Sequence, residues 1–438
     1  MEKIVLIGAG SQNFGLGIIG DIFKSQSLEG CEIFLHDIDK TTLANTKIIS
    51  NDYKEKLGVN IDIKASTSRK EALEGATFCI ISIEVGKRFD LWDQDWKIPL
   101  QYGIRQVYWE NGGPGVLFHS LRQIPPIIEI CEDINLICPD AVVFNFSNPM
   151  QRICHAVTTK FPDLKFIGLC HEIKSMNRQL PDLMETEMHN IEYRAAGLNH
   201  LSILLEARYK NTGKDGYPII KQNFDAYFSD LVNKHDAKPS KPGAERGVFR
   251  KLFKTYGYLP ITTDSHLGEY IQWAYSVADH DAILDFYDNY KEKCLAFYDN
   301  KTSYDHYFDL KNLDTHERVV PIIEGILSDS AYEEPAINIP NNGYIECLPK
   351  DIVVEVPGIV NKSGISGISF KNYPAAFGSL LNSQSGVIQM TTDAVLNASK
   401  HSAYLALLAD PVVNDSYQAE KLLNNMLETQ GKFLYYLK

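Results

Sequence analysis

The stretch Ile4-Val5-Leu6-Ile7-Gly8-Ala9-Gly10-Ser11 decides the fold of this chain. Its four apolar residues are typical of a strand that is buried on both faces of a parallel sheet. Two glycines follow, and the segment from Phe14 to Lys24 has the spacing of a helix. A strand, a glycine turn and a helix in this order let the backbone approach a pyrophosphate at the start of the helix. The third glycine of this motif is absent, because Asn13 stands in its place.

A second strand-like run, Glu32-Ile33-Phe34-Leu35-His36, ends at Asp37. An acidic residue at the end of the second strand is placed to bind a ribose diol, and it would repel a 2′-phosphate. We therefore expect NAD rather than NADP as the cofactor. The residues predicted to bind it are Gly8, Gly10, Ser11 and Asp37.

Strand-like and helical stretches continue to alternate along the chain. Apolar runs at 77–82 and 141–146 lie on either side of a helical stretch at 120–137. This order predicts an α/β fold with a doubly wound, Rossmann-type domain, as in lactate and malate dehydrogenases. A chain of 438 residues exceeds the size of a single core. We expect an NAD-binding domain at 1–170 and a mixed α/β domain at 171–438 for substrate, metal and oligomer contacts.

Composition limits the possible partners and compartments. The net charge of −13 argues against nucleic acid or an anionic membrane surface as a partner. The eight cysteines show no regular spacing, so a disulfide framework is not expected and a reducing cytoplasm is the natural compartment. No apolar run reaches the roughly 18 residues of a membrane span.

Two further strand ends carry metal-binding residue types. The apolar run Phe166-Ile167-Gly168-Leu169 stops at Cys170, and the segment Ala196-Gly197-Leu198-Asn199 stops at His200. A thiolate and an imidazole suit a borderline divalent cation, and two ligands would leave positions open for substrate and water. The alternative is ordinary packing, because a cysteine after an apolar run is usually buried.

Asn148 follows the strand predicted at 141–146 and precedes Pro149. Proline disfavours the helical region for the residue before it. Asn148 is therefore expected at the carboxyl edge of the sheet, where α/β proteins bind ligands. A contact with nicotinamide or substrate is predicted, and a simple turn asparagine is the alternative.

Together these motifs resemble glycoside hydrolase family 4, the NAD- and metal-dependent glycosidases. The segments that carry the resemblance are Gly8-Ala9-Gly10-Ser11, Asp37, Gly112-Gly113-Pro114-Gly115, Asn148-Pro149, Cys170-His171-Glu172, Gly197-Leu198-Asn199-His200, Ile337-Asn338-Ile339-Pro340-Asn341-Asn342-Gly343 and Val353-Val354-Glu355-Val356-Pro357. The resemblance implies oxidation of the sugar at C3, removal of the C2 proton, elimination of the aglycone and addition of water. It also implies that Cys170 and His200 bind the metal, with Mn(II) expected.

The resemblance leaves the proton-transfer residues less certain. Asp264, in the segment 258–266, matches an acidic type of base, and His171 beside the metal cysteine is the second predicted catalytic residue. Asp264 could instead be the N-cap of a helix over 265–275. His266 and Tyr270 are reserve candidates.

The residues after Cys170 bear on the substrate. Cys170-His171-Glu172-Ile173 resembles the Cys-His-Glu-Val subgroup associated with α-galacturonidases, so α-galacturonides are the predicted substrates. Phospho-glycosidases have an arginine near the position of Leu91, where it would clamp phosphate. The α-glucuronidase, α-galactosidase and α-glucosidase activities of the family are alternatives. The predicted substrate-binding residues are Asn148, Glu172 and Asn199, and the candidate cations for a uronate are Lys87, Arg88 and Arg246.

Two other classes remain open at this point. A 2-hydroxy-acid dehydrogenase would share the dinucleotide fold and the Asn148-Pro149 turn, but it would have no use for Cys170. A non-catalytic NAD sensor would not need Cys170, His200 and Asn148 together. Whichever of these classes applies, we expect a homodimer or homotetramer.

Overall fold

The computed structural model of the protein describes residues 2–10, 12–234, 246–299, 304–312 and 314–438. Ser11, predicted to bind the cofactor, lies outside these residues. Within them, eleven strands form one sheet in the order β3-β2-β1-β4-β5-β6-β9-β10-β7-β8, and β11 pairs with β10. The strands are β1 (Lys3–Ile7), β2 (Glu32–His36), β3 (Asp62–Ser66), β4 (Phe78–Ile81), β5 (Val142–Asn145), β6 (Phe166–Gly168), β7 (Ile191–Leu198), β8 (Leu201–Tyr209), β9 (Tyr332–Pro340), β10 (Val353–Asn361) and β11 (Gly364–Gly367).

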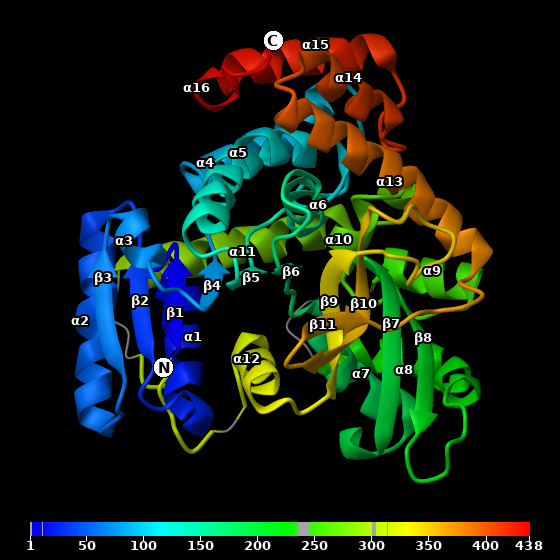
Figure 1. The fold of residues 1–438 in the computed structure, drawn as a ribbon. Helices are drawn as coiled ribbons and strands as arrows, with labels where there is room; N and C mark the ends of the chain where they lie inside the picture. Colours follow the sequence, from blue (N-terminus) through cyan, green and yellow to red (C-terminus); the bar gives the residue numbers. More distant parts are fainter. Residues whose placement is uncertain (1, 11, 235–245, 300–303, 313) are drawn as a thin grey trace.

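Helices cover both faces of the sheet (Figure 1). They are α1 (Gln12–Lys24), α2 (Lys40–Leu57), α3 (Arg69–Leu73), α4 (Arg88–Gln101), α5 (Gly113–Ile137), α6 (Met150–Lys160), α7 (Ser175–Met184), α8 (Tyr217–Lys234), α9 (Gly247–Tyr256), α10 (Asp264–Gly268), α11 (His280–Asp299), α12 (Val319–Ser328), α13 (Ala375–Leu396), α14 (Lys400–Ala409), α15 (Ser416–Thr429) and α16 (Gly431–Leu434).

The first six strands confirm the predicted dinucleotide-binding fold. All pairs from β3 to β6 are parallel, with Ile4 opposite Ile33 between β1 and β2, and Val5 opposite Cys79 between β1 and β4. Their apolar residues face helices on both sides, as expected for a doubly wound sheet. The chain changes direction of winding at β1, so the carboxyl ends of β1 and β4 lie beside each other at the edge where such folds bind ligands.

The rest of the sheet is antiparallel and joins the parallel part without a break. Gly168 of β6 pairs with Asn338 of β9, and β9, β10, β7 and β8 follow. The pairing of β6 with β9 therefore continues the sheet across the predicted boundary at residue 170. That division into 1–170 and 171–438 stays a prediction, since one sheet serves both parts.

The C-terminal helices pack back onto the N-terminal half. In Figure 1 the red and orange helices α13 to α16 lie over α5 and α6. Buried Arg122 of α5 donates to both oxygens of Asp95 in α4, at 3.0 and 2.6 Å, and to Gln430 at 2.6 Å. This network ties the end of the chain to the helices that border the cofactor domain.

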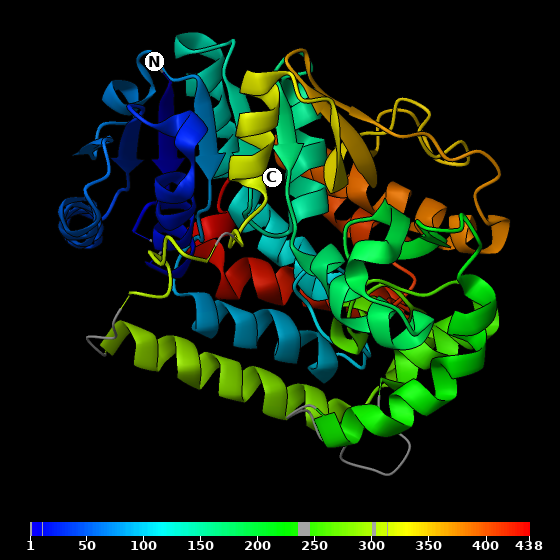
Figure 2. The same cartoon turned by 90° about the horizontal axis from the view of Figure 1, so that it is seen from below.

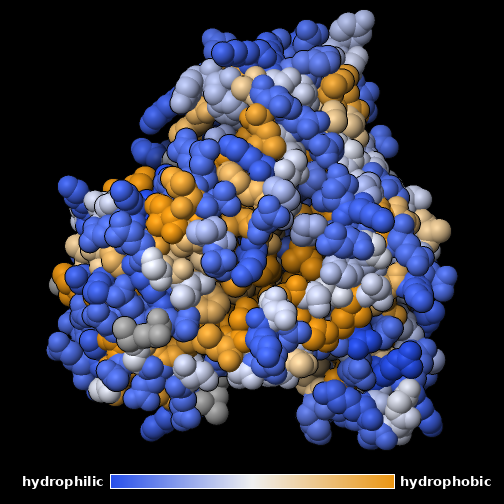
Figure 3. All heavy atoms as spheres, viewed as in Figure 1, coloured by the Kyte–Doolittle hydropathy of each residue, from blue (hydrophilic) through white to orange (hydrophobic). Residues whose placement is uncertain are grey.

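Helix α11 lies along α4 on the outside of the molecule (Figure 2). The Trp92 and Tyr290 rings stack at 6.1 Å, and Lys291 Nζ lies 3.3 Å from Asp93 Oδ2. Figure 3 shows a hollow near the middle of the face seen in Figure 1, with apolar residues gathered around it. Within the described ranges, we find no helix with both the length and the apolar character needed to cross a bilayer.

Candidate active site

Cys170 and His200 meet in the folded chain, as the sequence predicted. Cys170 lies just after β6, where the backbone N–H of Leu169 donates to the Asn145 carbonyl of β5 at 3.0 Å. The Cys170 Sγ atom is 3.2 Å from His200 Nε2. Thirty positions apart in the chain, the thiol and the imidazole therefore form one small site at the carboxyl edge of the parallel strands.

His200 occupies a conformation that is unusual for its residue type. Leu198 and Leu201 pair as the last and first residues of β7 and β8, so Asn199 and His200 form a two-residue turn. The φ of His200 is +61°, in the left-handed region that glycine normally fills. Such a residue costs on the order of 1–3 kcal/mol and persists where its surroundings fix it, often at functional sites.

The charge states of the pair suit a metal ligand set. Burial lowers the pKa of His200, and the nearby rings of His266 and His171 lower it further, so the imidazole is neutral and can donate a lone pair. Burial, then the charges of Glu355 and Glu172, raise the pKa of the Cys170 thiol well above its ordinary value. A dication would oppose that shift, because it stabilises the thiolate.

The ligand set is a pair and not a full cage. Among the residues that the structure describes, no group of three or more His, Cys, Asp or Glu side chains is arranged to hold a metal. The Nδ1 atom of buried His200 has no hydrogen-bond partner in the part of the chain that the structure describes. Cys170 and His200 fit an open divalent site that leaves several positions for substrate oxygens.

Two buried groups lie next to the pair: His266, a reserve catalytic candidate in the sequence, and Glu269, which the sequence did not single out. The ring centroids of His266 and His200 are 4.3 Å apart. The His266 Nδ1 atom lies 3.3 Å from Glu269 Oε1, and Glu269 also accepts from the backbone N–H groups of Glu110, Asn111 and Gly112 at 3.1, 2.7 and 2.7 Å. Burial would lower the pKa of His266, but the bond to Glu269 and its charge outweigh burial and raise it to about 9.

Asn148 reaches the same region from the end of β5. Its Nδ2 atom donates to Glu110 Oε1 at 3.0 Å. Glu110 precedes α5, the helix that opens with Gly113-Pro114-Gly115. Asn148 thus lies at the edge where it was predicted, beside a carboxylate that sequence reasoning missed.

The three other predicted contacts differ in their surroundings. Glu172 Oε2 accepts from Thr262 Oγ1 at 2.8 Å, and its charge acts on Cys170 and His266, so it faces the pair. The His171 side chain is 66% exposed, with Nδ1 3.9 Å from Glu317. Asn199 is only 1% exposed and donates from Nδ2 to Glu355 at 2.8 Å. Their catalytic and substrate roles stay predictions.

Asp264, the predicted base, has a clear local role. It is 8% exposed, and its two oxygens accept from the backbone N–H groups of Val248 and Phe249 at 3.0 and 2.9 Å. These groups begin α9, so Asp264 caps that helix and not the one that follows it in sequence. Burial raises the pKa of Asp264, while the two backbone bonds lower it.

The glycine turn after β1 is shaped to receive a ligand by its backbone. Gly8 has a φ of +90°, and a Cβ atom there would lie 2.0 Å from the Ser82 carbonyl oxygen. A Cβ atom on Gly10 would lie 2.5 Å from Thr42 Oγ1. The Gly10 N–H donates to Asp37 Oδ2 at 2.8 Å. This bond places Asp37, the residue predicted to bind the ribose, directly at the turn. These residues fit a dinucleotide cradle.

The candidate cations for a uronate lie in different places. Arg88, at the start of α4, places its guanidinium 4.4 Å from the Trp92 ring centroid, and its buried Nε has no partner among the described residues. Lys87 is exposed beside it. Arg246 precedes α9, with its guanidinium 5.7 Å from the Phe249 ring. Arg88 is the one that borders Glu110.

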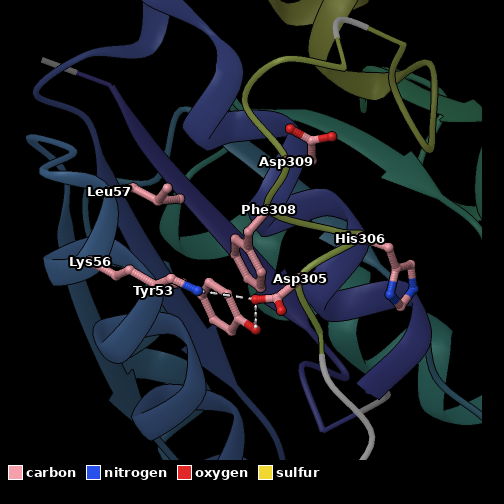
Figure 4. A pocket seen from close by; sticks show the side chains of 7 residues that line it. All are labelled: Tyr53, Lys56, Leu57, Asp305, His306, Phe308 and Asp309. Carbon is pink, nitrogen blue, oxygen red and sulfur yellow. Dashed lines mark hydrogen bonds and ion pairs between the residues drawn. The ribbon is translucent and has the colours of Figure 1, made fainter.

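A separate surface pocket of about 440 Å³ does not belong to this site. It lies between the end of α2 and the segment 305–309 (Figure 4), where the Tyr53 and Phe308 rings stack at 4.2 Å and Asp305 accepts from Tyr53 and Lys56. Its lining is Tyr53, Lys56, Leu57, Asp305, His306, Phe308 and Asp309. None of the predicted site residues is among them, and the pocket marks where this segment docks on α2.

A glycine turn suited to a dinucleotide and a thiol–imidazole pair suited to a metal lie at one edge of the sheet. Together they indicate a class of protein with a dinucleotide-binding fold and a divalent-metal site. Comparison with known families narrows this class. The model of family 4 glycosyl hydrolases matches residues 3–186, and the model of the family's C-terminal domain matches residues 195–413. The chain belongs to glycosyl hydrolase family 4. This confirms the predicted family and favours a glycosidase over a dehydrogenase or a sensor.

Characterised relatives span the whole chain. An alpha-glucosidase of Erwinia rhapontici is 46% identical, covering 100% of this chain and 99% of its own. An alpha-galacturonidase of Thermoanaerobacterium saccharolyticum is 30% identical, covering 98% of this chain and 96% of its own.

Solved structures share the fold. A 6-phospho-alpha-glucosidase from gut microorganisms, in complex with NAD and Mn2+, superposes with a TM-score of 0.81 at 20% identity, covering 99% of this chain and 98% of that one. Malate dehydrogenase of Plasmodium falciparum gives a TM-score of 0.53 at 14% identity over 93% of this chain and 100% of its own. The predicted resemblance to malate dehydrogenase holds for the fold.

Proposed function

We propose that the protein is an α-glycosidase that uses NAD and a divalent metal, with Mn(II) as the metal. The observation that carries this proposal is the 3.2 Å separation of Cys170 Sγ and His200 Nε2 at the edge of the sheet where β1 also ends in the glycine turn. The family supports it, as does a structural neighbour that holds NAD and Mn2+. The residues proposed to bind NAD are Gly8, Gly10, Ser11 and Asp37.

The chain's own groups have separable tasks in this proposal. When bound, NAD supplies reversible hydride transfer at a sugar carbon, and the metal supplies Lewis-acid polarisation of sugar oxygens. Asn148 and Glu172 would hold hydroxyl groups next to the pair. Acid–base work at C2 and at the leaving group falls to Asp264 and His171, with buried His266 close enough to His200 to serve as well.

Neutral α-glucosides are the proposed substrates. The carboxylates of Glu110 and Glu172 both act on His266 at the centre of the site, and Glu84 lies near Arg88. Several carboxylates around one sugar favour hydroxyl groups as partners and oppose a second anion. The alpha-glucosidase relative, at 46% identity over its full length, points in the same direction.

α-Galacturonides, the prediction from the Cys-His-Glu-Ile motif, are the second candidate. The Arg88 guanidinium supports them, because its Nε lacks a hydrogen-bond partner among the described residues. Arginine binds carboxylates in a bidentate geometry that lysine cannot match. A uronate bound there would need Arg88 to outweigh the repulsion from Glu110.

A panel of nitrophenyl α-glycosides separates the candidates. The purified protein is assayed with NAD, Mn(II) and a thiol reductant on the α-glucoside, α-galactoside, α-galacturonide and α-glucuronide. We expect the α-glucoside to have the highest kcat/KM. A higher value for the galacturonide, lost selectively in Arg88→Ala, would replace the α-glucoside proposal.

The order of chemical steps has its own test. Substrate carrying deuterium at C2 should react more slowly and exchange that deuterium with solvent, since the C2–H bond must break. A hydrolase that uses two carboxylates for direct displacement leaves the C2–H bond intact. Turnover without any C2 exchange or isotope effect would contradict the redox route.

We also propose a cytoplasmic homo-oligomer, as a dimer or tetramer. All eight cysteines, which lie within the described ranges, are free thiols. Helix α11 exposes Leu284, Phe286 and Leu295 by 38%, 58% and 46%, and Leu284 and Leu295, which share one side of the helix, would suit a subunit contact. Light scattering of the purified protein gives the mass, and a single 49.4 kDa species would exclude the oligomer.

A further inference from the structure

Glu355 is a buried carboxylate in the segment Val353-Val354-Glu355-Val356-Pro357, and neither the sequence motifs nor the proposed chemistry gives it a role. It lies in β10, opposite Gly197 of β7 and Asn338 of β9, and it is 3% exposed. Its neighbours along the strand are Val354 and Val356, both fully buried. A carboxylate in such a place is stable only with hydrogen-bond donors around it, so the identity of those donors shows what it holds.

Three side chains reach Glu355: Asn199 and Ser202 come from the β7–β8 hairpin that carries His200, and Asn338 comes from β9. Asn199 Nδ2 lies 2.8 Å from Oε2, and Asn338 Nδ2 lies 3.3 Å from the same oxygen. Ser202 Oγ lies 3.0 Å from Oε1. All three donors are 1% exposed or less. Glu355 thus gathers buried polar groups from β9 and from the turn that contains His200.

These donors connect Glu355 to both halves of the pair. Asn199 and Ser202 lie on either side of the His200–Leu201 step, so they fix the turn that presents the imidazole. Asn338 Nδ2 also lies 3.4 Å from the Gly168 carbonyl, at the end of the strand that leads to Cys170. One carboxylate therefore bridges the two chain segments whose side chains meet at 3.2 Å.

The turn has to be held because His200 takes a left-handed conformation. Asn199 is fixed at three points: its N–H donates to Gln151 Oε1 at 3.2 Å, its carbonyl accepts from Tyr270 at 3.1 Å, and its side chain donates to Glu355. Without the last bond, the Asn199 side chain would be free to turn. The His200 φ of +61° could then relax toward ordinary values and carry the imidazole away from Cys170.

We propose that Glu355 is a positioning residue that holds the Cys170 and His200 ligands in register for the metal. The proposal rests on the metal site proposed above. It assigns Glu355 no contact with metal or substrate. Groups that orient metal ligands in this way contribute to affinity through geometry.

The main experiment compares Mn(II) binding of the wild type and Glu355→Ala, followed by electron paramagnetic resonance of free Mn(II). We expect the variant to bind Mn(II) about 10- to 100-fold more weakly, the usual cost of losing a group that orients a ligand. NAD affinity, measured separately by calorimetry, should stay unchanged, because the glycine turn is far along the sheet from β10. Equal Mn(II) affinity in the two proteins would overturn the proposal.

Glu355→Gln separates hydrogen bonding from charge. The Ser202 hydroxyl has a single hydrogen, which can go to the Leu198 carbonyl at 2.8 Å. A glutamine amide can then donate to Ser202 Oγ and accept from Asn199 and Asn338 with its oxygen. We expect this variant to recover most of the Mn(II) affinity that Glu355→Ala loses. If it binds as weakly as Glu355→Ala, charge and not positioning accounts for the effect, and the proposal falls.

Two further sets of variants cover the remaining outcomes. Glu333→Ala is the matched control, because Glu333 of β9 pairs with Arg194 of β7 at 2.8 Å, away from the turn, and it should leave Mn(II) binding unchanged. If Glu355→Ala does not fold, Ser202→Ala and Asn338→Ala each remove one donor and should each weaken Mn(II) binding by a smaller factor. Wild-type affinity in both would overturn the proposal.

Cys170→Ser distinguishes failure of the proposal from failure of the site. Loss of Mn(II) binding in Cys170→Ser together with full binding in Glu355→Ala would leave the site standing and remove the role of Glu355. Unchanged binding in Cys170→Ser would remove the site itself and the proposal with it.

Discussion

The turn after β1 and the turn between β7 and β8 meet the same conformational demand with different residues. In the first turn Gly8 has a φ of +90°, and in the second turn His200 has a φ of +61°. In the first turn the backbone is the proposed ligand contact, and a Cβ atom on Gly8 would lie 2.0 Å from the Ser82 carbonyl oxygen. In the second turn the side chain is the proposed ligand, so glycine cannot serve.

The difference shows which residues offset the conformational free energy of a positive φ. At Gly8 the residue itself removes this cost, because glycine takes a positive φ without strain. At His200 it is met at a distance, by the buried donors and acceptors around Asn199 that include Glu355. We expect the first turn to be fragile to any added atom and the second to be fragile to the loss of distant partners.

The largest effect expected is at Gly8. Gly8→Ala should lower the free energy of unfolding by about 2 to 5 kcal/mol, since it combines an unfavourable φ with a backbone clash. It should also abolish NAD binding. Gly30 is the matched control: its φ is +81°, but among the described residues beyond its chain neighbours no heavy atom lies within 4 Å of its Cβ position. Gly30→Ala should cost only about 1 to 2 kcal/mol and leave NAD binding intact. Urea denaturation and calorimetry measure both, and NAD binding by Gly8→Ala would contradict the cradle.

The next effect tests the side-chain turn at its proposed metal. Cys170→Ser should reduce turnover by about 10²- to 10³-fold, because Lewis-acid stabilisation contributes several kcal/mol to such reactions. NAD affinity and the melting temperature without metal should change little. Cys347→Ser, which alters an exposed thiol, serves as the control. Full turnover with bound Mn(II) in Cys170→Ser would contradict the assignment.

Removal of the metal should lower the stability of the protein and leave its NAD affinity unchanged. Mn(II) at 100 times its dissociation constant is expected to stabilise the protein by about 2.7 kcal/mol, and a chelator should remove that increment. The chelated protein should keep its circular dichroism spectrum and its NAD affinity, because the protein's own hydrogen bonds hold both turns. In Cys170→Ser the chelator should have no effect on stability. Unfolding of the wild type by chelator alone would mean that the metal, and not the network around Asn199, holds the second turn.

The smallest effect concerns Asp264, the predicted base, which caps α9. Asp264→Asn should cost about 0.5 to 2 kcal/mol of stability, since one oxygen that accepts a backbone N–H becomes a donor. Asp415→Asn is the control, because Asp415 caps α15 by accepting from Tyr417 and Gln418 with a single oxygen, which asparagine retains, so a smaller loss of stability is expected there. Full turnover in Asp264→Asn would limit Asp264 to capping. A selective drop in turnover, with a larger C2 isotope effect, would support it as the base.

The parts of the site that lie at strand ends could be predicted from the sequence. Parallel strands bring their carboxyl ends to one edge, so an apolar run that stops at a polar residue already suggests where that residue goes. This is why Asp37, Asn148 and Cys170 lie where they were expected. The same local signal gave β1, β2, β4 and β5 within a residue or two.

The parts that depend on distant pairing could not be predicted. Asp264 caps a helix that begins earlier in the chain, and a cap is usually read only for the helix that follows. Glu269 and Glu110 meet across 159 positions. Glu355 had a signal that could have been used: a carboxylate inside the apolar run Val353-Val354-Glu355-Val356 must be buried, and a buried charge needs partners.

One sheet runs through both halves of this enzyme, joined where Gly168 pairs with Asn338. A fragment ending near residue 186 would leave β6 as a raw edge, ready to associate with strands of other molecules. The nucleotide-binding half is therefore not expected to survive as an isolated module, and chimeras that exchange halves between relatives should fail unless β9 is exchanged together with β6. New specificities in this architecture would then arise from side chains around an intact sheet.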